Sequence, residues 1–250
     1  MRRRERPLSG RRAEPEPPGG RALDGRAPGG DLGSRLQRAA AALGLALPAA
    51  FPAQAALYLD ELERWQRVAG LTGYRDRGAR ARHLLLESLL LLAVLPEPAA
   101  PLLDIGSGPG IPGLILKLAR PDWEIVLIEA TRRRANFLRH VIRHLGLRGT
   151  SVHWGRAEAL AQSPLAGRFQ TVAMRAVAAR GVAEGLAAPF LRADGVLVRA
   201  LGPREGAAGT GSRREVTLNL PGELPWRRQF LIIRRMDLEP DVSRGTQREP

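Results

Sequence analysis

The fold of this chain is decided by one stretch, LLDIGSGPGIPG at residues 102–113. Its apolar start predicts a buried strand, and the apolar run at residues 111–119 predicts a helix. The glycines between them allow a sharp turn and a close approach of the backbone to a ligand. Amides at the helix N-terminus are then free to bind that ligand. The stretch therefore predicts a ligand-binding turn between a strand and a helix.

Apolar strands and helices continue to alternate beyond this stretch. After a first strand at residues 101–105, strands are expected at 123–129, 151–154, 169–174 and 195–201, with helices at 131–147 and about 181–191. Two late strands, at 214–220 and 228–235, are joined by a turn around Pro221 and Gly222. Alternation of this kind predicts a parallel sheet with right-handed crossovers, and the late pair adds antiparallel pairing at one edge. The sequence therefore predicts an α/β, Rossmann-like fold with a mostly parallel seven-stranded sheet.

Dinucleotides and S-adenosylmethionine are the two ligands that bind at such a glycine turn. A dinucleotide fingerprint counted from Gly106 and Gly108 requires a third glycine where this chain has Ile111. Asp104 ends the strand before the loop, where a carboxylate suits the cationic amino-acid end of S-adenosylmethionine and would repel a pyrophosphate. Glu129 ends the next strand and can accept hydrogen bonds from ribose hydroxyls in either ligand. The combination favours a methyltransferase, with a dinucleotide site or a turn without ligand as alternatives.

The chain divides into four parts. Residues 1–33 are rich in Arg, Gly and Pro, and we expect this arm to be disordered. Residues 34–96 form a helical section, in which Ser34 caps a helix to about residue 47 and further helices span about 52–69 and the run through His83 to residue 95. The methyltransferase domain follows at residues 97–236, and a polar tail occupies residues 237–250.

The composition narrows the chemistry and the partner. There is no cysteine, which excludes disulfides, thiolate metal sites and a cysteine nucleophile, and four scattered histidines lack zinc-ligand spacing, so no metal is predicted. A net charge of +14 favours a polyanionic partner, although a GC-rich genome also explains the preference for Arg over Lys. The longest apolar run, at residues 84–95, is shorter than the roughly 20 residues of a membrane span. We therefore expect a soluble, cytoplasmic protein without a membrane partner.

The end of the fourth strand bears on the methyl acceptor. Enzymes that methylate exocyclic amines usually carry Asp or Asn, two prolines and an aromatic residue there, whereas this chain has MRAV at residues 174–177. A ribose hydroxyl would require a lysine-rich site, and Lys117 lies on a different helix. By elimination, the acceptor is expected to be an intrinsically nucleophilic atom such as the 7-nitrogen of guanine.

Three runs, DIGSGPGIPGLIL, TRRRANFLRHVIRHLGL and MRAVA, together resemble the RsmG family, also called GidB. The upstream segments RWQRVAGLTGYRD and RHLLLES resemble the helical signature of the same family, so that the resemblance covers about residues 57–178. Members of the family are bacterial enzymes that methylate guanine N7 in small-subunit ribosomal RNA. The resemblance thus implies S-adenosylmethionine as cofactor and 16S ribosomal RNA, free or in the small subunit, as substrate.

The resemblance also implies particular site residues. Gly106 and Ile111 match cofactor contacts of the loop, and Glu129 matches the ribose position. Ala157 and Glu158 resemble the pair beside the adenine. Arg156 and Arg175 resemble family arginines in the site, with Arg175 at a position that contacts the cofactor.

Several arginines are interpreted from the residues themselves. Arg175 follows a buried strand, where its guanidinium could bind the cofactor's carboxylate or the carbonyl oxygen beside guanine N7, and it cannot act as a base. Arg132, Arg133 and Arg134 open a helix, where cations oppose the helix dipole. This placement favours an RNA-facing role, or a place at the lip of the cofactor site, over a merely solvated charge run. Arg82 and His83 are weaker candidates for contact with RNA, because such a pair on a helix surface is often only solvated.

The chain departs from the family pattern in three places. Gly70 stands where the family usually has Asn, and Glu87 lies one place later than the family's acidic residue after His83. Leu201 replaces a Lys before Gly202, so that Arg199 or Arg204 would have to supply a cation there. These departures bear on which nucleotide is methylated more than on the chemistry.

We therefore expect a monomeric ribosomal RNA (guanine-N7)-methyltransferase. The rival functions are an S-adenosylmethionine-dependent methyltransferase of another substrate and a non-catalytic RNA-binding module. The sequence leaves open which guanine is modified, and whether the substrate is free RNA or an assembled subunit.

Overall fold

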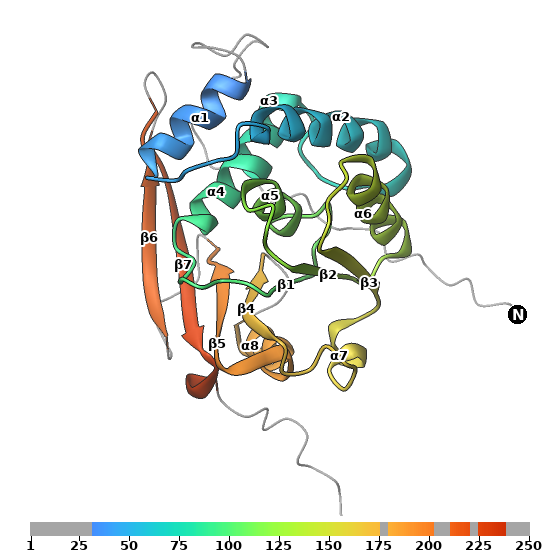
Figure 1. The fold of residues 1–250 in the computed structure, drawn as a ribbon, viewed down its shortest axis with the longest axis vertical. Helices are drawn as coiled ribbons and strands as arrows, with labels where there is room; N and C mark the ends of the chain where they lie inside the picture. Colours follow the sequence, from blue (N-terminus) through green and yellow to red (C-terminus); the bar gives the residue numbers. More distant parts are fainter. Residues whose placement is uncertain (1–31, 176–179, 203–210, 221–224, 239–250) are drawn as a thin grey trace, which may run out of the picture.

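The computed structural model describes residues 32–175, 180–202, 211–220 and 225–238. Seven strands form one sheet in the order β3-β2-β1-β4-β5-β7-β6 (Figure 1). The strands are β1 (Leu102–Ile105), β2 (Ile125–Glu129), β3 (Thr150–Trp154), β4 (Phe169–Met174), β5 (Leu191–Ala200), β6 (Ser212–Leu218) and β7 (Trp226–Arg234). The first five pair in parallel, and β7 pairs antiparallel with both β5 and β6. The predicted α/β fold, with its mostly parallel seven-stranded sheet, is confirmed.

Helices cover both faces of the sheet. The helices are α1 (Leu32–Ala42), α2 (Phe51–Ala69), α3 (Arg77–Arg80), a π-helix (Ala81–Leu86), α4 (Glu87–Leu92), α5 (Gly113–Ala119), α6 (Arg132–His144), α7 (Ala157–Leu160) and α8 (Arg180–Ala187). Apolar residues of α1, α2, α4, α5 and α6 pack in one cluster with Leu102, Ile125 and Leu127 of the sheet. The alternate residues Leu103 and Val126 pack in the other cluster, with α7 and α8. The period of two along β1 and β2 thus divides the core into two layers.

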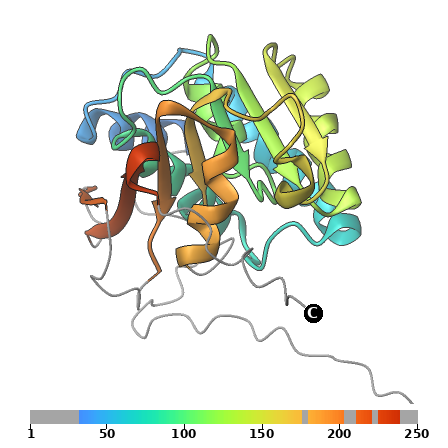
Figure 2. The same ribbon diagram turned by 90° about the horizontal axis from the view of Figure 1, so that it is seen from below.

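The two edges of the sheet differ in character. Seen from below, the β6–β7 hairpin lies at one edge and α6 at the opposite one (Figure 2). β1 and β2 are buried along their whole length, as strands covered on both faces should be. β6 begins with four exposed residues and is buried only at Leu218. The turn predicted around Pro221 and Gly222, most of the expected arm and most of the expected tail lie outside the described residues.

Three helix predictions need correction. α1 ends at Ala42 and not near residue 47, because Gly44 adopts a left-handed conformation (φ 67°) that closes the helix before Pro48. The third predicted helix is interrupted by the π-helix before α4. The helix predicted to reach residue 191 ends as a short 3-10 turn at Phe190, and β5 begins at Leu191, four residues earlier than expected.

Candidate functional site

The loop between β1 and α5 curves over the carboxyl ends of β1 and β2. Gly106, Gly108 and Gly110 have φ angles of 73°, 55° and 93°, a region that side chains disfavour. The amides of Gly106 and Ser107 donate to the carbonyl of Ile128 on β2. The glycines that the sequence singled out are therefore the ones that shape this loop.

Asp104 lies beneath the loop and is fully buried. Its Oδ2 accepts a hydrogen bond from the Gly113 amide at 3.0 Å, whereas Oδ1 has no partner among the described residues. Burial raises the pKa of this carboxyl to about 7, against the lowering effect of the hydrogen bond from the Gly113 amide. A buried carboxyl oxygen without a donor is costly unless something else supplies one.

Gly113 is a site residue for which the sequence predicted no role. A Cβ atom there would overlap the Leu127 side chain and lie 2.8 Å from Asp104 Oδ2. Glycine is therefore required for α5 to start directly against β1 and β2. The available signal was a glycine in the first turn of a helix, where it is not a favoured residue.

Glu129 fastens the loop to the next strand. Its Oε2 accepts from the Gly108 amide at 2.8 Å, and its Oε1 accepts from the Thr131 amide at 2.7 Å. The residue is 4% exposed. Because each carboxylate oxygen has two lone pairs, Glu129 keeps capacity for further donors such as ribose hydroxyls.

Trp154 is a second site residue that was not predicted from the sequence. It ends β3 in register with Glu129, is 51% exposed, and its Nε1 donates to the Ala130 carbonyl. The guanidinium of Arg132 lies 5.4 Å from the centre of its ring. An aromatic residue at a strand end beside the predicted ribose acid was the signal for it.

The remaining predicted residues around this edge are mostly exposed. Ala157 is buried and begins α7, while Arg156 and Glu158 on either side of it are exposed. Arg132 and Arg133 are exposed at the start of α6, whereas Arg134 is partly buried and donates to the Gly70 carbonyl at 3.1 Å. Arg134 therefore joins α6 to the end of α2, while its two neighbours face solvent.

These residues fit S-adenosylmethionine. Asp104 Oδ1 is a buried acceptor without a donor among the described residues, which suits the ligand's ammonium group directly or through a water molecule. Glu129 at the next strand end suits the ribose, and the half-exposed indole of Trp154 offers a face to a flat base. The loop amides complete the set of donors.

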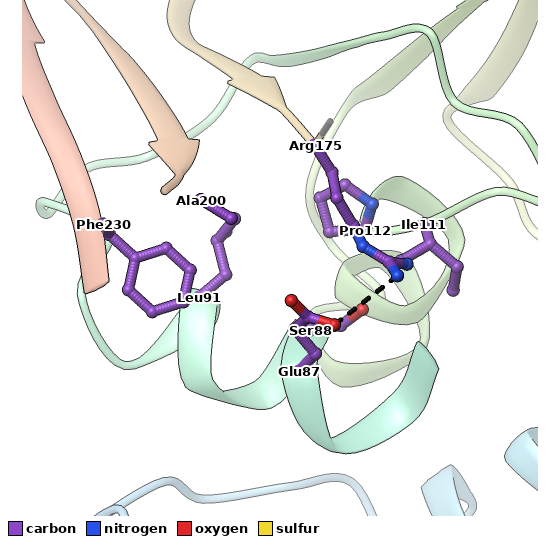
Figure 3. Close-up of a pocket in the computed structure, with 8 residues that line it drawn as sticks. All are labelled: Glu87, Ser88, Leu91, Ile111, Pro112, Arg175, Ala200 and Phe230. Atoms are coloured by element: carbon purple, nitrogen blue, oxygen red, sulfur yellow. Dashed lines mark ion pairs between the residues drawn. The ribbon is translucent and has the colours of Figure 1, made fainter. Parts of the chain in front are cut away.

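Beside the loop lies a pocket that contains Arg175 (Figure 3). It is a shallow depression, and the roughly 200 Å³ of empty space around its lining atoms includes open solvent. Its lining residues come from five segments of the chain: Glu87, Ser88, Leu91, Ile111, Pro112, Arg175, Ala200 and Phe230. Ile111 and Arg175, which the sequence predicted as cofactor contacts, are thereby brought together, and Glu87 and Phe230 join them from distant parts of the sequence.

Two arginines hold the carboxylate of Glu87. Arg175 Nη2 lies 3.5 Å from Glu87 Oε2, and Arg228 Nε donates to Glu87 Oε1 at 3.2 Å. The guanidinium of Arg228 also lies 4.8 Å from the centre of the Trp226 ring. The acidic residue is therefore held between β4 and β7.

The helical N-terminal section supports the loop directly. The hydroxyl of Tyr58 on α2 donates to the Pro109 carbonyl at 2.9 Å. Burial raises the pKa of this fully buried phenol, so that it remains a donor at neutral pH. The helices before the α/β domain are thus part of the site.

The departures from the family pattern have structural explanations. Gly70 caps α2 in a left-handed conformation, which Asn also tolerates. His83 lies within the π-helix Ala81–Leu86, which ends directly before Glu87. The wider turn of a π-helix takes up an additional residue, so that Glu87 faces the pocket although it comes one place late. Arg199 is buried on β5, which does not suit an RNA contact, and Arg204 lies outside the described residues.

His83 and Arg82 lie against aromatic rings. His83 stacks on Tyr74 at 4.4 Å and meets the edge of Trp226, and burial lowers its pKa to about 4. A neutral imidazole does not suit the phosphate contact that the sequence suggested. Arg82 lies over the Trp226 ring at 5.2 Å.

Among the described residues, no group of three or more His, Cys, Asp or Glu side chains could hold a metal ion. None of the described helices is both long and apolar enough to span a membrane.

Comparisons with known proteins identify the family of this chain. The chain matches the family model described as GidB, rRNA small subunit methyltransferase G, over residues 52–216. Ribosomal RNA small subunit methyltransferase G of Sorangium cellulosum is 40% identical over 166 residues, 66% of this chain and 70% of that protein. The protein of the same name from Chloroflexus aggregans is 38% identical over 201 residues, 75% of this chain and 83% of that protein. Among solved structures, cofactor-bound Rv0187 from MTB is 17% identical with a TM-score of 0.49, covering 72% of this chain and 90% of that one. The family match and the identities to its members show that this chain belongs to the rRNA small subunit methyltransferase G (GidB) family.

Proposed function

We propose that this chain transfers a methyl group from S-adenosylmethionine to N7 of one guanine in 16S ribosomal RNA. Its family makes it a ribosomal RNA methyltransferase. The choice of N7 rests on the pocket beside the loop. Of the charged side chains that line it, Arg175 is a hydrogen-bond donor without a lone pair to offer, and Glu87 is paired with two arginines. A pocket without a free base suits an acceptor that has a lone pair and no proton to lose.

Each residue of the site then has a definite task. When bound, S-adenosylmethionine supplies an electrophilic methyl group. Asp104 and the loop amides hold the amino-acid end, Glu129 holds the ribose, and Trp154 and Ala157 flank the adenine with Glu158 at the rim. Arg175 and the pocket hold the guanine so that N7 faces the methyl group. Catalysis rests on this positioning, without a covalent enzyme intermediate.

The RNA is held by exposed arginines around the same edge. Arg132, Arg133 and Arg156 are exposed beside the cofactor loop and β3, where they can neutralise phosphates. The net charge of +14 supports a polyanionic substrate. The chain acts as a monomer in the cytoplasm, on the small subunit or its RNA.

Methyl transfer to total ribosomal RNA tests this function. We expect tritium from labelled S-adenosylmethionine to enter 16S RNA, and strand scission at 7-methylguanosine to map it to one guanine. Transfer at a position resistant to scission would point to another acceptor atom. Binding of RNA without any transfer would favour the non-catalytic module, and transfer to protein or small molecules alone would favour a different substrate.

A further inference from the structure

The pocket presents an acceptor and a donor side by side. Glu87 Oε2 and Arg175 Nη2 are 3.5 Å apart, with side chains 11% and 22% exposed, and both groups face the pocket (Figure 3). The separation is long for a charge-assisted hydrogen bond, which is usually about 2.7–2.9 Å. Each group is partly exposed and has lone pairs or N–H groups that this ion pair does not use.

We propose that Glu87 reads the Watson–Crick edge of the target guanine. In this arrangement the carboxylate accepts hydrogen bonds from N1–H and the 2-amino group, and Arg175 donates to O6. The proposal rests on the proposed function, since it requires guanine as the substrate base. It makes Glu87 a specificity-determining residue.

The chemistry of the bases explains the discrimination. Along the Watson–Crick edge of guanine, two donors stand next to one acceptor, which matches a carboxylate next to a guanidinium. Adenine presents an acceptor at N1 and a donor at its 6-amino group, which would set like against like in this pocket. Sites built to hydrogen-bond one substrate discriminate strongly, because a wrong substrate leaves buried polar groups unpaired.

The carboxylate of Glu87 is held ready for this role. Arg228 Nε binds its other oxygen at 3.2 Å, and Arg228 itself packs over Trp226. The neighbouring hydroxyl of Ser88 is used within the helix, where it donates to the Leu84 carbonyl at 2.7 Å. Of the two polar residues that α4 contributes to the pocket, Glu87 is thus the one available to a base.

The remaining walls suit a flat ring. Leu91, Pro112, Ala200 and Phe230 line the pocket with apolar surface. Bases displayed by single-stranded RNA are commonly recognised by such surfaces together with hydrogen bonds to their edges. The pocket therefore combines stacking surface with one edge-reading pair.

The test is a double-mutant cycle that combines a substitution of Glu87 with removal of the 2-amino group of the target guanine. The mapped guanine is replaced by inosine in a ligated 16S RNA, which removes only the 2-amino group. With the wild-type enzyme, we expect inosine to lower kcat/KM for methyl transfer roughly 10–100-fold. With Glu87→Ala, guanine and inosine should be methylated at the same reduced rate, because the partner of the 2-amino group is gone.

A purely structural role for Glu87 gives a different result. If Glu87 only orients Arg175, the ratio of guanine to inosine rates stays the same in wild type and variant, which would overturn the proposal. If the wild-type enzyme forms no 7-methylguanosine at all, the proposed function fails instead. The two failures are therefore distinguishable.

Controls protect the test against misfolding. S-adenosylhomocysteine affinity and thermal unfolding are measured for every variant. If Glu87→Ala does not fold, Glu87→Gln replaces it in the cycle. The ratio of kcat/KM for guanine to that for inosine should then be smaller than in the wild type, because an amide offers one acceptor oxygen in place of two. The matched control is Glu124→Gln, an exposed glutamate paired with Arg168 at 2.8 Å, which should leave the ratio unchanged.

Discussion

The cofactor half of this molecule and its pocket half are built in different ways. The cofactor half comprises β1, β2 and β3, whose ends present Asp104, Glu129 and Trp154 within one continuous segment of chain. The pocket half joins α4, the loop, β4, β5 and β7, so that Glu87 and Phe230 line one pocket although they are far apart in sequence. One half is a local motif with parallel strands, and the other depends on the antiparallel return of β7 beside β5.

The difference separates what is general in this enzyme from what is specific. In the proposed function, the loop, the buried Asp104 and the strand-end Glu129 hold the methyl donor. They carry no information about the base. In the proposal above, discrimination depends on the pocket, where α4, β4 and β7 bring opposite charges together.

The largest expected effect follows from Arg175, which lies where the two halves meet. Arg175→Ala should lower methyl transfer by about 10²–10³-fold, the usual cost of removing one fixed donor from an active site. Arg175→Lys should recover little, because a point charge does not reproduce the planar fork. The fold should survive, since Glu87 keeps Arg228 as partner.

Methyl-transfer rates with circular dichroism check this prediction. A folded Arg175→Ala enzyme with a near wild-type rate would make this arginine structural. The affinity of Arg175→Ala for S-adenosylhomocysteine shows whether Arg175 binds the base or the cofactor. Unchanged affinity places Arg175 on the base, and weakened affinity places it on the carboxylate of the cofactor.

A smaller effect is expected from Asp104, which belongs to the cofactor half alone. Its pKa is raised from 3.8 to about 7 by burial, so the folded protein binds a proton that the unfolded chain has released. Stability that this group contributes is therefore present at low pH and is lost as pH rises through about 7. Asp104→Asn should remove this slope, which is at most about 1.4 kcal/mol per pH unit, and be the more stable protein at pH 8.

The affinity for S-adenosylhomocysteine is expected to show the opposite dependence on pH. Because the ligand's ammonium favours the ionised carboxylate, wild-type affinity should increase as pH rises toward about 7 and then level off. In Asp104→Asn the affinity should be roughly tenfold weaker at pH 8, without this increase. Calorimetry between pH 5.5 and 8 measures both. If the wild-type affinity does not depend on pH, Asp104 does not bind the ammonium group of the ligand.

The smallest effect concerns RNA affinity. Replacing the exposed Arg132 and Arg133 by Ala should reduce the slope of log affinity against log salt by about one for each phosphate that is no longer neutralised. Cofactor affinity should change little in Arg133→Ala, and slightly more in Arg132→Ala because Arg132 lies over Trp154. Filter binding of 16S RNA at several salt concentrations tests this. An unchanged slope would mean that both arginines are only solvated and do not contact RNA phosphates.

The sequence alone determined the strand–loop–helix unit, the number of strands, the late hairpin and the acids at two strand ends. These features depend on local rules, namely apolar runs in buried strands, glycine in tight turns and carboxylates where strands end. Boundaries were less well determined, as α1 and the start of β5 show, because Gly44 ended one helix and pairing with Phe169 extended the strand.

Only the tertiary structure decided the pocket, the role of Gly113 and the place of Trp154. The close approach of α5 to Leu127, the π-helix before Glu87 and the arrival of Arg228 from β7 bring together segments that are distant in sequence. No periodicity or local propensity encodes such contacts, because they depend on how the helices and the sheet pack. In the proposed function, the local motif therefore binds the methyl donor, and the packing of distant segments selects the base that is methylated.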